Sequence, residues 1–116
     1  MATTARRALL EEAADLVDGD RNAQYGDPRQ DFQRTGIYWS THILGVLHRK
    51  AHEQGITLTA EVEQILATIV DPHDVAIMMT QLKLSRLAWS PSKRDSYADG
   101  AGYLACGSEC AELSGT

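Results

Sequence analysis

The fold is decided by residues 71–103, which read DPHDVAIMMTQLKLSRLAWSPSKRDSYADGAGY. Asp71 and Pro72 suit the N-cap and the first position of a helix, and the apolar residues that follow occupy more than one helical face. The Ser-Pro-Ser sequence at residues 90–92 predicts a turn. A second helix, expected over about residues 92–112, returns antiparallel to the first. The stretch therefore predicts a helical hairpin whose first helix is the central helix of the fold.

Opposite charges are expected to meet across this hairpin. Lys83 and Arg86 lie three residues apart on one face of the first helix, and Asp95 and Asp99 lie four apart on one face of the second. A turn centred near Pro91 places Lys83 opposite about residue 99. Two interpretations stay open. The cluster is either a ligand-binding site or a set of interhelical salt bridges that ties the hairpin together.

As a binding site, the cluster has the chemistry of a magnesium–phosphate site. Magnesium takes one or two carboxylates and completes its shell with water and phosphate oxygens. Asp95 and Asp99 are therefore the candidate metal ligands, and Mg²⁺ is the candidate cofactor. Lys83 and Arg86 are candidate ligand-binding residues, because an ammonium and a bidentate guanidinium both neutralise phosphate.

The rest of the chain predicts helices and no strand, because alternating apolar patterns and hairpin turns are scarce. Residues 18–28 are dense in turn formers and predict a linker. Three helices follow from apolar spacing and caps: residues 5–17, residues 29–53, and a short helix that Thr59 begins and that carries a stripe of Val62, Ile65, Leu66 and Ile69. We expect an all-α, compact bundle of four to five helices that forms one domain over residues 1–116, with about residues 1–4 and 113–116 frayed.

Composition limits the classes of function. A chain of 116 residues is long enough for one domain with a modest core. The net charge of −5 argues against general nucleic-acid binding and against binding to a membrane surface. The longest apolar run, Val75 to Met79, is too short to span a bilayer, and the first residues do not form a signal peptide. We therefore expect a cytoplasmic protein. Cys106 and Cys110 lie four apart in a helix, where a disulfide would be strained, so we expect reduced thiols.

The loop Tyr25-Gly26-Asp27-Pro28 is the second candidate for ligand binding. Its glycine permits a positive φ, and an aromatic side chain beside it can stack on a base or a sugar. The alternative is a structural loop whose tyrosine packs onto the bundle. Both interpretations stay open from the residues alone.

Three other sets of polar residues are best explained by ordinary surface positions. His48 and His52 have the spacing of a zinc pair but lack a third ligand, so a solvated helix face is favoured. Three acids of the first helix, Glu11, Glu12 and Asp15, are expected on its solvent face. Glycines inside the last helix, Gly100, Gly102 and Gly107, are expected where another helix approaches the backbone closely.

The chain resembles a group of small uncharacterised bacteriophage proteins over roughly residues 17–107. The resemblance rests on RNAQYGDPRQDFQRTGIYW, DVAIMMTQLKLSRL and RDSYADGAGYLA, which contain a YGDP loop, a K-x-x-R helix and a D-S-x-x-D-x-x-G-Y helix. That group is similar to the nucleotide-modification-associated domains of phages and, more distantly, to the all-α MazG-like nucleotide pyrophosphohydrolases. The residues that match its motifs are Tyr25, Gly26, Asp27, Lys83, Arg86, Asp95, Ser96, Asp99 and Tyr103.

The resemblance implies a nucleotide site in which four acids hold magnesium. MazG-like enzymes place E-x-x-E on one helix and E-x-x-D on another, and Asp95 and Asp99 would stand for one pair. The second pair is not evident. Asp71 and Asp74 have the required spacing, but Asp74 lies on the order of 20 Å along its helix from the seam. The acids of residues 11–15 qualify only if the first helix packs against the last.

Two functions stay open from the sequence. The first is a phage-encoded nucleotide-binding protein, extending to a magnesium-dependent nucleotide pyrophosphohydrolase that acts in phage nucleotide metabolism or modification. In that case Tyr25, Gly26, Asp27, Lys83, Arg86 and Tyr103 would contact the nucleotide. The second is a non-enzymatic helical module that binds a host or phage protein. Either function fits a homo-oligomer, because small helical domains often complete their core by self-association.

Overall fold

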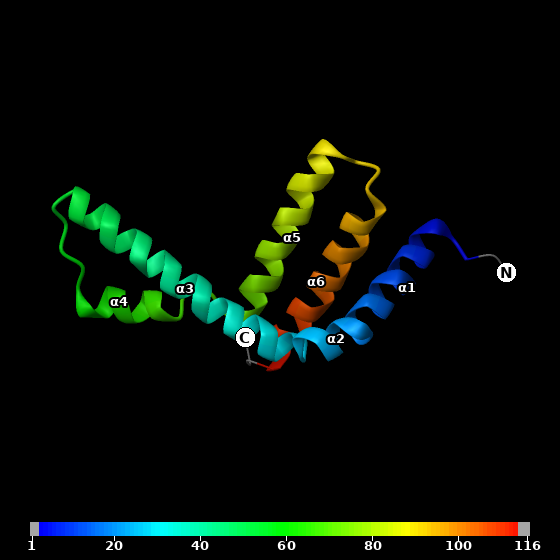
Figure 1. Cartoon of the computed structure of the whole chain (residues 1–116), viewed down its shortest axis with the longest axis horizontal. Coiled ribbons are helices and arrows are strands. Elements are labelled where there is room, and N and C mark those ends of the chain that lie inside the picture. Colours follow the sequence, from blue (N-terminus) through cyan, green and yellow to red (C-terminus); the bar gives the residue numbers. More distant parts are fainter. Residues whose placement is uncertain (1–2, 114–116) are drawn as a thin grey trace.

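The computed structural model describes residues 3–113, apart from the side chains of residues 20, 21 and 113. Within this part the chain is all-helical, which confirms the predicted fold class (Figure 1). The five expected helices are present, and a short sixth helix joins them. The helices are α1 (Ala5–Asp18), α2 (Asp20–Tyr25), α3 (Pro28–Glu53), α4 (Ala60–Ala67), α5 (Pro72–Trp89) and α6 (Arg94–Leu113).

Helix α2 corrects the linker that the sequence predicted over residues 18–28. Its six residues contain neither glycine nor proline, and Gly19 and Gly26 bound it on either side. Fraying was expected at both ends of the chain, but residues 1–2 and 114–116 lie outside the described part. Inside it, Thr4 caps α1, because its side chain accepts a hydrogen bond from the Arg7 amide at 3.2 Å.

The core lies along the hairpin of α5 and α6, which form the most extensive helix pair of the molecule. Val75 and Ala76 of α5 are fully buried, with Val75 near Gly36 of α3 and Ala76 against Gly107 of α6. A Cβ on Gly107 would lie 2.8 Å from the Cβ of Ala76, so glycine is required for this close approach. Gly102 is also tight, since a Cβ there would lie 3.1 Å from Val17 of α1. The expected close packing is therefore confirmed at these two glycines.

Two further elements cover the hairpin. Helix α1 packs along α6, and the first half of α3 contacts both α5 and α6. The second half of α3 extends beyond this body and pairs with α4 to form a projecting arm (Figure 1). The arm is joined to the body at a buried point where the Val70 amide donates a hydrogen bond to Ser40 Oγ at 3.0 Å. Compact packing thus holds for the body, while the molecule measures 65 × 33 × 26 Å overall.

Two apolar surfaces that the sequence assigned to the interior are exposed in the single chain. Of the α4 stripe, only Leu66 is buried, whereas Val62, Ile65 and Ile69 are exposed. The predicted stripe is therefore mostly uncovered, because α4 packs mainly against α3. Helix α5 is central in sequence order and packs against α6 and α3, yet its opposite face is open to solvent. Within residues 3–113, no helix is both long and apolar enough to cross a bilayer.

Candidate functional site

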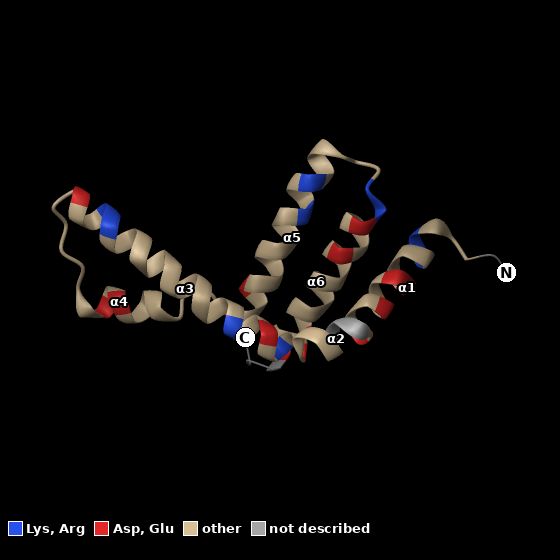
Figure 2. Cartoon of the chain, viewed as in Figure 1, with Lys and Arg blue, Asp and Glu red and all other residues tan. Residues whose placement is uncertain are grey.

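A cleft of about 480 Å³ opens where α5 and α6 meet their connecting turn. Its volume lies within the range of about 300–1,000 Å³ that is typical of small-molecule sites. Figure 2 shows basic residues at this end of α5 and in the turn, beside acidic residues at the start of α6. The cleft is lined by Lys83, Arg86, Trp89, Ser90, Lys93, Asp95, Ser96 and Asp99. All four charged residues that the hairpin pattern singled out therefore lie together.

At the inner end of the cleft, Lys83 and Asp99 form an ion pair. Lys83 Nζ lies 3.0 Å from Asp99 Oδ2, in the register expected from the turn position. The two side chains are only 13% and 30% exposed, so both charges are largely removed from water. The Cβ of Lys83 lies over Gly100, where an added Cβ would make an ordinary contact at 3.9 Å. This half of the cluster is therefore a structural tie between α5 and α6.

The outer half of the cleft holds charges without such a tie. Arg86, Lys93 and Asp95 are exposed, and within the described part of the chain none of them forms an ion pair. Of the charged groups that line the cleft, three are cationic and two are carboxylates. Because Asp99 is already paired with Lys83, the uncommitted charge at the mouth is mainly positive. Such a surface attracts an anion more readily than a cation.

The turn that forms the wall of the cleft is held in place by hydrogen bonds. Tyr97 Oη donates to the Pro91 carbonyl at 2.8 Å, and the Lys93 amide donates to the Ser90 carbonyl at 3.1 Å. Directly before this turn, the Trp89 side chain is 90% exposed. A large aromatic ring that contacts little of its own chain is available to stack on a planar ligand.

Helix α1 reaches the same end of α6 but adds no acid to the cleft. Glu12 Oε2 accepts a hydrogen bond from Arg94 Nε at 2.8 Å, so it fixes the start of α6. Glu11 pairs with Arg7 within α1, and Asp15 is exposed. The acids of α1 were candidates for a second metal-binding pair only if α1 packs against α6, and it does. Its acids are nevertheless not among the residues that line the cleft.

The donor set around Asp95 and Asp99 does not fit a resident magnesium ion held by four acids. Among the described residues, three metal-ligating side chains come together at the end of α5 opposite the cleft: Asp71, His73 and Asp74. These acids are already engaged in capping, since Asp74 Oδ2 accepts a hydrogen bond from the Asp71 amide at 3.0 Å. An ammonium 3.0 Å from Asp99 also opposes a divalent cation there.

The YGDP loop lies outside the cleft and shapes the start of α3. Gly26 adopts φ = +83°, a conformation that favours glycine. Asp27 caps α3 by accepting a hydrogen bond from the Arg29 amide at 2.9 Å, and it pairs with the Arg29 guanidinium at 2.9 Å. The hydrogen bond from that guanidinium lowers the pKa of the Asp27 carboxyl to about 2. Arg34 also donates to the Tyr25 carbonyl at 3.0 Å.

Tyr103 is a core residue and does not line the cleft. Its ring is buried and lies 6.2 Å from the ring of Phe32, measured between centroids. Both rings border a small apolar cavity of about 20 Å³, together with Pro28 and Asp99. Asp99 is therefore the one predicted site residue that borders both the cleft and this cavity. The predicted site divides into a cleft group and a group that builds the corner between α2, α3 and α6.

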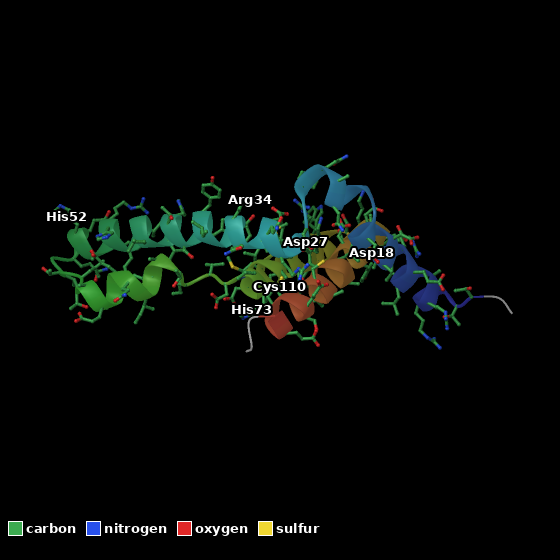
Figure 3. The ribbon with its side chains drawn as sticks, turned by 90° about the horizontal axis from the view of Figure 1, so that it is seen from below. Asp18, Asp27, Arg34, His52, His73 and Cys110 are labelled. Carbon is green, nitrogen blue, oxygen red and sulfur yellow. The ribbon has the colours of Figure 1, made fainter. Side chains whose placement is uncertain are left out.

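The remaining candidates have structural explanations. Cys106 and Cys110 are buried and form no disulfide among the described residues, which confirms the predicted reduced thiols, and burial raises the pKa of the Cys110 thiol. In Figure 3, Asp27 and Cys110 lie near the middle of the molecule, whereas His52 lies at the far end of the arm. His48 Nε2 lies 3.2 Å from Glu63 of α4, so this histidine helps to join the arm.

Sequence reasoning missed Trp89, Ser90 and Lys93 as parts of the cleft. The signal was present, because a tryptophan ends an apolar helix and a lysine follows the Ser-Pro-Ser turn. A hairpin places both sides of its turn at the same end of the helix pair. Residues that flank the turn should therefore have been counted with the charged seam.

Comparison with known proteins gives a family and two relatives. A family model described as Domain of unknown function (DUF6378) matches residues 8–111. The chain is 31% identical over 99 residues to the Gene 55 protein of Mycobacterium phage D29, and the alignment covers 85% of this chain and 50% of the phage protein. It is 27% identical over 96 residues to the Gene 55 protein of Mycobacterium phage L5, which covers 83% and 47%. The chain spans about half the length of these curated relatives. No solved structure matches it.

Proposed function

The chain belongs to the DUF6378 family and is similar to phage proteins, and from that premise we propose that it binds a nucleotide or another small phosphorylated ligand in the α5–α6 cleft. One observation carries the proposal. Arg86 and Lys93 face a cleft of about 480 Å³ without ion-pair partners among the described residues, and the exposed ring of Trp89 stands beside them. A planar, anionic ligand matches both features.

Each group has a definite part in this proposal. The Arg86 guanidinium binds phosphate oxygens in bidentate fashion, and the Lys93 ammonium supplies a second positive charge from the turn. Trp89 stacks on the base. Lys83 and Asp99 hold the two helices at a fixed separation, so the cleft keeps its shape before the ligand arrives. The ligand then meets a largely preformed site, which lowers the entropic cost of binding.

Magnesium and hydrolysis remain untested predictions. Asp95 is exposed and unpaired within the described residues, so it can contribute one ligand to a magnesium ion that arrives with a polyphosphate. A bound magnesium ion would neutralise phosphate charge and activate water. No further acid lines the cleft, so this chain's own residues support binding more strongly than the MazG-like pyrophosphohydrolase reaction. As a phage-encoded protein, it would act on nucleotides in the host cytoplasm.

The alternative function, a helical module that binds a protein, is favoured by a different observation. The outer faces of α4 and α5 expose large apolar side chains. Contiguous exposed apolar surface is a feature of protein–protein contact sites. The predicted homo-oligomer belongs to this part of the proposal. Ligand binding and self-association use different surfaces, so one does not exclude the other.

A thermal-stability panel tests the ligand proposal. The chain is heated with inorganic pyrophosphate and with ribo- and deoxyribonucleoside mono- and triphosphates, each with and without magnesium chloride. A ligand present at 100 times its Kd stabilises the folded chain by about 2.7 kcal/mol. We expect a rise in Tm with at least one nucleotide. A panel without any rise at millimolar ligand contradicts the proposal.

A pair of variants locates the binding. Arg86→Ala removes a charge-assisted hydrogen bond worth about 1.5–3 kcal/mol, which weakens binding by about 10- to 100-fold. Arg6→Ala is the matched control, because Arg6 is exposed on α1 and does not line the cleft. Equal affinities for the two variants would show that any binding occurs elsewhere.

A further inference from the structure

The exposed face of α5 is uncharged and mostly apolar. Six exposed side chains of α5 form two neighbouring rows along the helix, each following the spacing i, i+4, i+7. The first row is Ile77, Gln81 and Leu84, and the second row is Met78, Leu82 and Ser85. All six residues are exposed and none is charged. We call these six residues the α5 outer face.

A second exposed apolar surface lies on the arm. Val62 and Ile65 of α4 are exposed on the arm together with Ile69, which lies just beyond the end of α4, and Ile65 is 66% exposed. The sequence pattern assigned these residues to the interior because apolar spacing of this kind marks a buried face. Nothing in the described part of the chain covers them. The chain therefore carries two uncovered apolar surfaces, on elements that are not in extensive contact with each other.

The chain exposes more surface than a compact monomer of its mass, and this excess is comparable to the area that a permanent homodimer covers on each partner. The chain exposes 8295 Å², whereas a compact monomer of 12.7 kDa exposes about 6,200 Å². The difference is about 2,000 Å². The radius of gyration is 17.6 Å, against about 13 Å for a compact domain of this length. A standard protein interface covers about 800 Å² per partner, and permanent homodimers cover more.

We propose that the α5 outer face and the exposed stripe of α4 form the interface between two copies of this chain. A second copy of the chain is large enough to cover both surfaces together. In a two-fold arrangement, each copy offers the same surface and receives the same surface. Helix α5 then becomes the buried central helix that its sequence pattern predicts. α6 and α1 lie on the other side of α5 and stay outside the interface (Figure 1).

This inference is independent of the ligand site. The interface residues do not line the cleft, and the assembly needs no nucleotide. The core of the single chain supports the same conclusion. Among the described residues, Val75 and Ser40 are the largest fully buried side chains. Because the fully buried side chains are small, the single chain has a small core, and much of its apolar surface is left to be buried by association.

The test is the mass of the full chain in solution, measured by light scattering and by sedimentation over a concentration series without ligand. We expect a dimer of about twice 12.7 kDa at micromolar concentration. Leu84→Glu places a charge on the α5 outer face, and we expect at least a 100-fold weaker association. Leu84 is 58% exposed in the single chain, so the fold does not depend on it.

Leu10→Glu is the matched control. Leu10 is 61% exposed on α1, away from the interface, so this variant should dimerise like the wild type. Leu84→Gln, which adds no charge, should weaken association by a smaller factor while the circular dichroism spectrum stays helical. A wild-type chain that remains monomeric at 100 times those concentrations overturns the proposal without reference to any variant. Unchanged dimerisation of a folded Leu84→Glu variant also overturns it.

Discussion

Replacing Asp99 with alanine tests whether the charged seam of the hairpin includes a structural tie. The substitution leaves the Lys83 ammonium without its partner at a position where the lysine side chain is only 13% exposed. Exposed ion pairs contribute about 0–1 kcal/mol, and breaking a fully buried pair costs about 3–5 kcal/mol. Since Asp99 itself is 30% exposed, we expect an intermediate loss of about 2 kcal/mol in the free energy of unfolding.

The assay is chemical denaturation followed by helical circular dichroism, at one protein concentration for all variants. Asp95→Ala is the matched control, because it removes the carboxylate of an aspartate that lies one helical turn before Asp99. Asp95 is exposed and makes no ion pair with a described residue, so its loss should change stability by less than about 0.5 kcal/mol. A thermal scan should show the Asp99 variant melting about 8 °C lower.

The reasoning is refuted if the two alanine variants are equally stable. A double-mutant cycle sharpens the result, since the coupling between Lys83→Ala and Asp99→Ala isolates the pair from other effects. We expect a favourable coupling that weakens only slightly with added salt, because the pair is largely shielded from solvent. A coupling near zero would mean that the 3.0 Å contact contributes no stability.

Two further predictions follow from helix packing and capping. Gly107→Ala should destabilise the chain by about 1–3 kcal/mol, because the new Cβ meets Ala76. Gly100→Ala should stabilise the chain by up to about 1 kcal/mol, because an added Cβ there makes only ordinary contacts. The denaturation midpoints of the two variants are compared with that of the wild type. The pKa of Asp27 is lowered to about 2 in the folded chain from 3.8, so its pairing with Arg29 stabilises the fold above pH 4 and is lost as pH falls towards 2. Asp27→Asn should therefore flatten the acid side of the stability profile, which a pH series of melting curves will detect, and an unchanged profile would contradict this assignment.

The hairpin was predictable from the sequence because its signals are local. A capping box, a helix-starting proline and a Ser-Pro-Ser turn fix where α5 begins and ends. The antiparallel register then follows from the turn, and Lys83 meets Asp99 as expected. The charged cluster was accordingly predictable as a cluster. Its division into a tied inner half and an open outer half was not, because that depends on burial.

The role of the YGDP loop could not be read from spacing. A glycine beside an aromatic residue suits a ligand loop and a helix cap equally well. The deciding facts are three-dimensional: Asp27 bonds the Arg29 amide, and the loop lies apart from the cleft. The exposed stripes of α4 and α5 failed as core predictions for a related reason. An apolar pattern predicts burial but does not say whether the same chain or a second copy supplies the cover.

The central claim is that the α5–α6 cleft binds a phosphorylated ligand, and amide chemical-shift mapping tests it most directly. A ¹⁵N-labelled chain is titrated with the panel ligand that raises Tm most. We predict saturable shifts that are largest at Arg86, Lys93 and the Trp89 indole N–H, with the YGDP loop little changed. Shifts that stay absent at millimolar ligand, or that centre on residues 25–28 instead, would contradict the account.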